Sequence, residues 1–269
     1  MRAALGLIAI AACGFRGAQL GGDALGSDDA IALVDSTDFD AAAVDAGTAD
    51  AARLPFCPAD PHLRLCYSFD QPSLPANLPD EGAVAVSAHV TNVSTVASPK
   101  GRAAQLGATS EIWVPMVAGV TNIQAFEVWF RYDAELGANN AREGLVDSNV
   151  SPPNISLFFY RADPTHTMRC GLGGQVEVWN ATLMPGHWYY AACVCDAGRL
   201  TMYLDGAQIG QTAGTCGSGG GFVADGFTIG ANNNGGEANP TELLLGAIDG
   251  VRLWDVTLTP AQVCATAGC

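Results

Sequence analysis

The chain has 269 residues, of which 14% are charged, and its formal net charge is −15 at pH 7. Its 12 Lys and Arg residues are outnumbered by 27 Asp and Glu residues, which argues against binding of nucleic acid, because phosphates are neutralised by clustered cations. A hydrophobic share of 49% together with 32 glycines is typical of a β-protein with glycine turns and a true core.

Residues 1–13 have the features of a targeting segment. Arg2 precedes a short apolar run, Leu5 to Ala12, that is too brief to span a bilayer. The run ends in Ile10-Ala11-Ala12-Cys13-Gly14, which resembles the lipobox of bacterial lipoproteins. The resemblance implies that Cys13 becomes the lipidated first residue, and Gly14 implies the outer membrane of a Gram-negative bacterium. The alternative is an ordinary secretory signal with an incidental cysteine, and then the protein is secreted.

Residues 14–55 are predicted to be a disordered tether. They consist mainly of Ala, Asp, Gly, Ser, Thr and Val. Such a segment buries too little apolar surface to offset the entropy lost on ordering. A flexible coil of this length reaches on the order of 35 Å. We therefore expect one folded domain, residues 56–269, on a flexible spacer.

From Leu63 onward the chain alternates short apolar runs with turn residues. Three consecutive strands are expected within residues 187–210, where 196–199 and Asp205-Gly206 supply tight turns. The other expected strands are 63–70, 83–88, 103–107, 111–115, 125–133, 144–148, 155–162, 168–174, 175–180, 225–233 and 243–258. A short helix is expected after them, with Thr259 as N-cap and Pro260 at its first position. Many short strands split by Gly and Pro turns favour an all-β sandwich or jelly roll.

The cysteines predict a disulfide framework. Of nine cysteines, assigning Cys13 to the lipid leaves eight, which can form four disulfides in an oxidising compartment. The expected hairpins bring Cys195 near Cys216, and Cys193 can reach a neighbouring strand that carries Cys170. Local links are expected at the two ends of the domain, between Cys57 and Cys66 and between Cys264 and Cys269. Eight cysteines allow 105 pairings, so these four are hypotheses. A zinc site made by Cys193, Cys195 and His187 is an alternative, although the spacing is unusual for zinc ligands.

Several motifs occur in an order that resembles the laminin G-like (LamG) family of concanavalin A-like domains. They are the strand Phe126–Arg131, Trp188 followed by a hairpin that ends in Tyr203-Leu204-Asp205-Gly206, and the late strand Gly246–Val251. Leu245 and Gly250 depart from the family pattern. The resemblance covers about residues 60–265. It implies a concanavalin A-like β-sandwich (jelly roll) of two antiparallel sheets.

No catalytic residues are predicted. Glucanases of this fold carry Glu-x-Asp-x-x-Glu along one strand, and no Glu in this chain is followed two residues later by Asp. Glu127 and Glu177 stand singly and are expected to face outward from their strands. A carbohydrate-active hydrolase with an unrecognised site is kept as an alternative.

Asp70 and Asp249 are candidate ligands for a structural calcium ion. The resemblance places them where related domains often hold calcium, and carboxylates with backbone carbonyls would suffice. The alternative is that Asp70 caps a turn and Asp249 accepts hydrogen bonds from backbone amides.

The candidate ligand-binding residues are an aromatic side chain and amides in expected loops. They are Trp179, Asn180, Asn232, Asn233 and Asn234, because glycan sites pair aromatic groups with polar loop residues. The alternatives are a buried core tryptophan and an ordinary turn. The expected role is non-catalytic binding of a glycan or an extracellular protein at the cell envelope. A structural envelope protein without a specific ligand is the second hypothesis.

Overall fold

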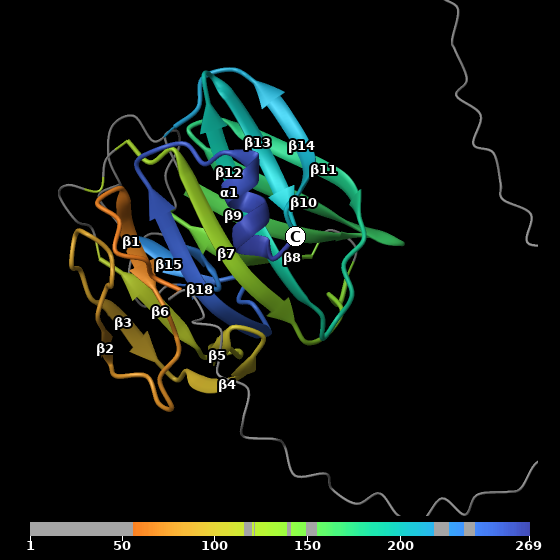
Figure 1. Cartoon of the computed structure of the whole chain (residues 1–269). Helices are drawn as coiled ribbons and strands as arrows, with labels where there is room; N and C mark the ends of the chain where they lie inside the picture. Colours follow the sequence, from red (N-terminus) through yellow and green to blue (C-terminus); the bar gives the residue numbers. More distant parts are fainter. Residues whose placement is uncertain are drawn as a thin grey trace, which may run out of the picture. The chain divides into compact units, whose positions relative to one another are not determined.

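Two antiparallel β-sheets pack face to face in the computed structural model, which describes residues 56–115, 120, 122–138, 141–148, 155–217, 226–233 and 240–269 (Figure 1). The predicted signal segment, the predicted tether and Asn234 lie outside these residues. No helix among the described residues is long and apolar enough to cross a membrane.

The first sheet has eight strands. In spatial order they are β14 (Ala207–Ala213), β13 (Arg199–Leu204), β12 (Trp188–Asp196), β7 (Ala125–Tyr132), β18 (Gly246–Trp254), β5 (Gly101–Gln105) and β4 (Ser94–Ser98), and β1 (Leu63–Tyr67) also pairs with β18. The strand pairs are antiparallel throughout.

The second sheet also has eight strands. In spatial order they are β11 (Gln175–Ala181), β10 (Thr165–Leu172), β9 (Ile155–Ala162), β8 (Arg142–Asp147), β15 (Phe227–Ile229), β6 (Glu111–Val114), β3 (Ala88–Thr91) and β2 (Asn77–Leu78). Two short strands, β16 (Asn232–Asn233) and β17 (Pro240–Thr241), form a separate pair. This architecture confirms the predicted β-sandwich.

The main core lies between the sheets, because alternate residues of each strand point inward. On β7 the inward residues are Phe126, Val128 and Phe130, as their spacing predicted. On β18 a bulge between Ile248 and Val251 keeps both of these side chains in the core.

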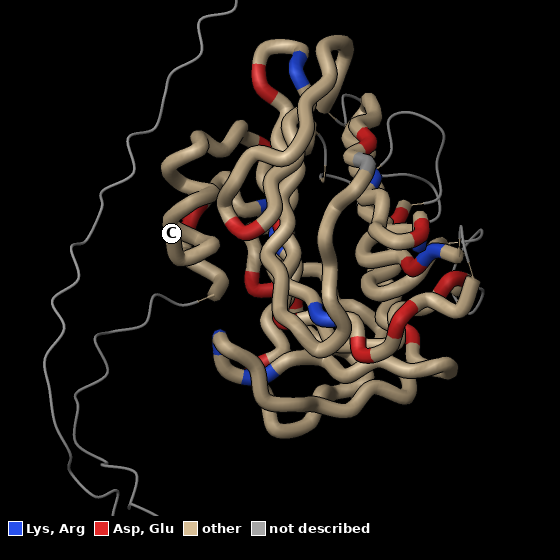
Figure 2. Tube along the Cα trace, turned by 90° about the vertical axis from the view of Figure 1, so that its right-hand side faces the viewer, with Lys and Arg blue, Asp and Glu red and all other residues tan. Residues whose placement is uncertain are grey.

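A second, smaller core lies on the outer face of the first sheet. It holds the alternate residues of the same strands, among them Trp129, Tyr190 and Trp254, together with Val263 of the helix α1 (Pro260–Ala267). Figure 1 shows α1 in front of this sheet, and in Figure 2 it lies beside the strands, next to the C-terminus. The helix α1 therefore covers part of the outer face of these strands.

The helix α1 begins where the sequence predicts. Thr259 is the N-cap and forms a reciprocal capping box with Gln262, and Pro260 occupies the first turn. Gly268 ends the helix in the left-handed conformation, and its N–H donates to the Cys264 carbonyl.

The hairpins of residues 187–210 form as predicted. β12 and β13 are joined by Ala197 and Gly198, and β13 and β14 by Asp205 and Gly206. All four residues have positive φ, between 48° and 80°. Positive φ at both central residues is what a tight two-residue hairpin turn requires.

The prediction of a strand at 83–88 is wrong, since the strand begins at Ala88. The Asp80 carboxylate accepts hydrogen bonds from the backbone N–H groups of Cys66, Gly82 and Ala85 at 2.7–2.9 Å. Ala85 also has a positive φ of 59°. These bonds hold the apolar segment as a loop beside β1, so its alternation does not produce a strand.

Four disulfides join the cysteine pairs that the sequence predicted. They are Cys57–Cys66, Cys170–Cys193, Cys195–Cys216 and Cys264–Cys269. One detail of the prediction is wrong: Cys170 and Cys193 lie in opposite sheets, on β10 and β12, so their bond crosses the core. Because Cys193 and Cys195 are both in disulfides, the zinc alternative is excluded.

Candidate functional site

A cavity of about 700 Å³ lies on the outer face of the first sheet. Its floor comes from β7 and β18, and its walls come from α1, the turn between β4 and β5, and the first residues of the domain, Phe56 and Pro58. We call it the Glu127 pocket, after the carboxylate in its floor. Cys57–Cys66 and Cys264–Cys269 fix the chain segments on two sides of it.

The floor of the Glu127 pocket follows from strand periodicity. β7 contributes Glu127 and Trp129, and β18 contributes Arg252 and Trp254. Residues two apart on a strand share a face, and the antiparallel register places Arg252 directly opposite Glu127. A Glu-x-Trp strand thus lies beside an Arg-x-Trp strand.

Glu127 is 2% exposed, and both of its carboxylate oxygens accept hydrogen bonds. Oε1 accepts from the Tyr190 hydroxyl. Oε2 accepts from Nε1 of Trp254 at 2.8 Å and lies 3.5 Å from Nη1 of Arg252. Burial, followed by the Glu127 charge, raises the pKa of Tyr190, so this hydroxyl stays protonated as a donor. Glu127 faces outward from β7, as expected, but it is buried, because α1 and its neighbours cover this face.

Cations lie over the aromatic walls of the pocket. Nζ of Lys100 is 4.7 Å from the centroid of the Trp129 ring and donates to the Thr266 carbonyl at 3.3 Å. The Arg252 guanidinium lies 4.2 Å from the centroid of the Phe56 ring. These distances are within the range of cation–π attraction. The pocket therefore combines aromatic faces with two cations and a fixed carboxylate.

Asp70 and Asp249, the candidate calcium ligands, contact the same β4–β5 hairpin. Oδ1 of Asp70, which lines the pocket, accepts the Arg102 N–H at 2.8 Å, and Oδ2 of Asp249 accepts the Ser98 hydroxyl. At Gly101, where φ is +136°, a Cβ would lie 2.0 Å from Oδ1 of Asp70, so only glycine fits this approach. Asp70 thus holds the backbone of β5 beside the β4–β5 turn.

The described residues contain no group of three or more His, Cys, Asp or Glu side chains placed to hold a metal ion. A calcium ion held by Asp70 and Asp249 would therefore take its other ligands from backbone carbonyls and water. Calcium binding stays a prediction.

The candidate residues Trp179 and Asn180 lie on β11, at an edge of the second sheet. The pairing with β10 shifts register opposite them, which marks a β-bulge. Asn180 is exposed, has a φ of 64° and accepts a hydrogen bond from Thr165. The side chain of Trp179 lies outside what the structure describes.

Asn232 and Asn233 form β16, and neither lines the Glu127 pocket. The Asn232 amide donates to Thr241 at 3.0 Å. Asn233 is fully buried, its N–H donates to Asp147, and its amide donates to the Gly226 carbonyl. These contacts give Asn233 a structural role in β16.

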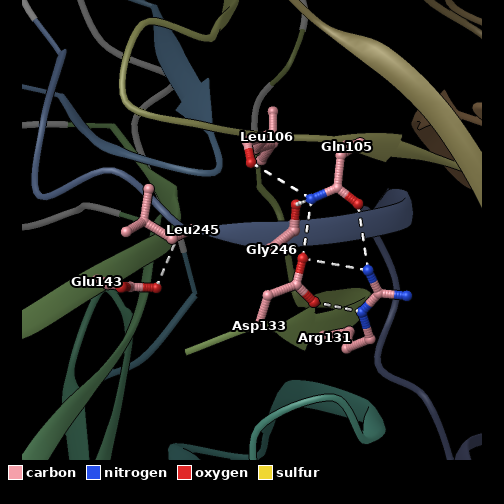
Figure 3. Close-up of polar contacts among 7 residues, drawn as sticks. All are labelled: Gln105, Leu106, Arg131, Asp133, Glu143, Leu245 and Gly246. Carbon is pink, nitrogen blue, oxygen red and sulfur yellow. Dashed lines mark hydrogen bonds and ion pairs between the residues drawn. The ribbon is translucent and has the colours of Figure 1, made fainter. Parts of the chain in front are cut away.

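A second polar cluster lies at the end of β7, where Arg131 and Gln105 both bond to Asp133 (Figure 3). Burial alone would raise the pKa of Asp133, but hydrogen bonds from Arg131 and Gln105 hold it below its ordinary value. Nearby, Glu143 is buried and accepts the Leu245 N–H at 3.2 Å. Burial raises the pKa of Glu143 to about 7, and the charges of Glu135 and Asp133 add to the shift.

The sequence interpretation missed the pocket residues Lys100, Trp129, Arg252 and Trp254. The sequence did contain a signal for the floor, in the motifs Glu127-x-Trp129 and Arg252-x-Trp254. Each motif puts a charged residue and a tryptophan on one face of its strand. The walls had no such signal, since they come from segments far apart in the chain.

A family model described as the concanavalin A-like lectin/glucanases superfamily matches residues 106–264. No curated protein matches the chain.

Several solved structures share the fold. Domain 4 of AbnA, a GH43 extracellular arabinanase from Geobacillus stearothermophilus solved with arabinotriose, is 20% identical with a TM-score of 0.56, over 76% of this chain and 98% of that domain. A Trypanosoma rangeli sialidase solved with the inhibitor DANA is 15% identical, with a TM-score of 0.52, over 76% of this chain and 32% of that one. The binding domain of botulinum neurotoxin serotype D is 9% identical, with a TM-score of 0.56, over 77% of this chain and 50% of that one. At these identities the likeness shows the fold alone.

Proposed function

The chain belongs to the concanavalin A-like lectin/glucanases superfamily, and we propose that its domain is a non-catalytic glycan-binding module held at the cell envelope by a lipid on Cys13. The observation that carries the proposal is the Glu127 pocket, where Trp129, Trp254 and Phe56 offer aromatic faces beside fixed polar groups. Sugar sites need this combination, because rings stack on aromatic faces while polar groups set orientation. The arabinotriose bound by the arabinanase domain supports a glycan as the class of ligand.

The pocket walls support binding without large rearrangement. Two disulfides link the segments beside the pocket, and the capping box fixes the first turn of α1. A site ordered before binding loses less conformational entropy when the ligand arrives.

The hydrogen bonding of Glu127 supports a non-catalytic role. A retaining glycosidase needs a nucleophile and an acid about 5 Å apart, both free to react with the sugar. Glu127 accepts hydrogen bonds from Tyr190 and Trp254 and faces Arg252, so both of its oxygens are engaged by the protein. We therefore expect Glu127 to organise the pocket floor and not to attack a glycosidic bond.

A glycan array probed with the full chain tests the proposal. We expect binding to a defined set of glycans, and we expect Ala265→Trp to abolish it, because Ala265 is exposed and lines the pocket. Ala261→Trp is the matched control, since Ala261 lies on the same helix, is exposed and does not line the pocket. Trp179→Ala tests the site suggested by the sequence and should leave binding intact.

Four results would contradict parts of the proposal. Equal binding by the two helix variants would place the ligand outside the Glu127 pocket. Loss of binding in Trp179→Ala alone would move the site to β11. Release of sugar from any bound glycan would restore the hydrolase alternative. An array without any bound glycan would contradict glycan binding. The remaining hypotheses would then be binding of an extracellular protein or a purely structural role.

A further inference from the structure

The polar groups that line the Glu127 pocket are unevenly satisfied. Its acidic groups already have donors, since both oxygens of Glu127 accept hydrogen bonds and Oδ1 of Asp70 accepts one from Arg102. Two buried donors, Nε1 of Trp129 and Nε of Arg252, have no hydrogen-bond partner among the described residues. Their residues are only 8% and 9% exposed. A buried donor without an acceptor is destabilising, so a ligand acceptor that reaches these nitrogens as neighbouring side chains move is favoured here.

This excess of donors distinguishes among sugar substituents. A hydroxyl group brings a donor together with its acceptor lone pairs, and its donor would have to share the Glu127 oxygens with Tyr190 and Trp254. An ionised carboxylate brings acceptors only, with about four lone-pair positions. Hydrogen bonds from Arg, Lys or an indole N–H to an ionised carboxylate are also stronger than bonds to a neutral group.

The lysine at the rim favours the same ligand. Lys100 is the only lysine in the sequence, and its ammonium group lies over the Trp129 ring. Because it lies over that ring, a sugar that stacks on Trp129 requires the Lys100 side chain to move. The flexible Lys100 side chain can then pair with a carboxylate at the edge of the sugar ring.

The charge of the whole chain limits the ligand further. A net charge of −15 repels a polyanion at long range, and Figure 2 shows that Lys and Arg residues are few along the trace. A single carboxylate on an otherwise neutral glycan avoids most of this repulsion. We propose that the Glu127 pocket binds a sugar bearing one carboxylate, which pairs with Lys100, Arg252 and the indole N–H of Trp129. This inference rests on the proposed glycan-binding function.

Paired ligands test the inference with the full chain. Affinities are measured by isothermal titration for methyl hexuronides, their methyl esters and the neutral methyl hexosides of the same stereochemistry. We expect the uronides to bind roughly tenfold or more tightly than both neutral series, as a charge-assisted bond allows. Free acetate should bind far more weakly than the uronides, because it lacks a ring to stack.

Two variants with the same loss of charge locate the effect. Lys100→Met should abolish the preference for uronides, so that uronides and neutral hexosides bind this variant with equal affinity. Arg199→Met removes one positive charge at the turn between β12 and β13, away from the pocket, and should leave the preference unchanged. In the unmodified chain, a bound uronide should also protect Lys100 from an amine-acylating reagent, as mapped by peptide mass spectrometry.

The outcomes separate the inference from the proposed function. Equal affinity for acidic and neutral sugars would overturn the inference and leave glycan binding in place. A preference lost equally in Lys100→Met and Arg199→Met would reflect general electrostatics and would overturn the assignment to this pocket. Failure to bind any glycoside here, together with an empty glycan array, would overturn both.

Discussion

At the scale of single residues, Glu143 is the carboxylate whose environment most disfavours its charge. It is buried on β8 and accepts a hydrogen bond from the Leu245 N–H. The Tyr132 hydroxyl is buried and has no hydrogen-bond partner among the residues that the structure describes. Burial, and then the charge of Glu135, raises its pKa. Glu135 and Asp133 add negative charge nearby. The protonated form of Glu143 is therefore favoured in the folded state.

The raised pKa of Glu143 predicts a loss of stability as the pH rises. Its pKa is about 7 in the folded protein against an ordinary 4.5. The folded state holds the proton more tightly, so the stabilisation is fully present below pH 4.5 and is lost as the pH rises through 7. The difference corresponds to about 3 kcal/mol, which partial solvation reduces to about 2 kcal/mol. Urea denaturation between pH 4.5 and 8 measures it.

Glu143→Gln keeps the shape of the neutral acid and removes the titration. We expect this variant to be more stable than the parent at pH 8 and to show a flatter pH dependence. Glu177→Gln, at an exposed position on the outer face of β11, should follow the parent curve. Parallel curves for Glu143→Gln and the parent would show that Glu143 is ionised across this range.

Calcium is the other prediction that depends on individual carboxylates. If Asp70 and Asp249 hold a calcium ion, millimolar calcium should raise the melting temperature, because a ligand bound only to the native state stabilises it. Asp249→Asn should abolish the rise. Asp163→Asn, at an exposed position after β9, should leave it intact. An unchanged melting temperature in the parent protein would end the calcium hypothesis.

Some site residues could be predicted from the sequence and others could not. Strand alternation predicts that Glu127 and Trp129 share the outer face of β7. It does not tell whether that face meets solvent or chain, because the covering comes from Phe56, Lys100 and α1, distant in sequence. Asn233 shows the opposite error. A polar residue in an Asn-rich segment is expected to be exposed in a loop, but it is fully buried, and its N–H donates to Asp147, a residue distant in sequence.

At the scale of elements, the prediction is most accurate where local signals agree. The hairpins of 187–210 have alternation and two turns with positive φ, and the helix has its cap, so both form where predicted. The segment 83–88 has alternation alone, and the bonds from Asp80 hold it as a loop. β4 was not predicted, because STVAS has little apolar alternation and is held by pairing with β5.

The disulfide between the sheets should contribute more stability than the one at the C-terminus. Cys170 and Cys193 are 23 residues apart, whereas Cys264 and Cys269 are 5 apart. Loop-closure entropy then predicts losses of about 3 and about 2 kcal/mol when each pair is replaced by alanine. The cavity left by the core pair adds to the first loss. Urea denaturation of the two double variants compares them, and equal losses would contradict this account.

At the scale of the whole molecule, the pocket lies where the domain begins. Phe56, in the pocket wall, directly follows the predicted tether in sequence. The opposite wall comes from α1, at the C-terminal end of the domain. A binding site built from both ends of the domain depends on the complete domain, and removal of α1 would open the pocket. The proposed function therefore requires residues 56–269 as a unit.

The lipid anchor is the prediction that determines where this unit acts. If Cys13 is acylated, the protein should remain in the membrane fraction after washes with high salt and carbonate, because several acyl chains anchor stably where a single chain does not. Cys13→Ser should release it into the soluble periplasmic or extracellular fraction. Metabolic labelling with an alkyne fatty acid should tag the parent protein and not this variant.

Gly14→Asp, which keeps the cysteine, should stay acylated but move from the outer to the inner membrane fraction on a density gradient. Unlabelled parent protein in the soluble fraction would favour the secretory alternative, with Cys13 lost in the cleaved signal.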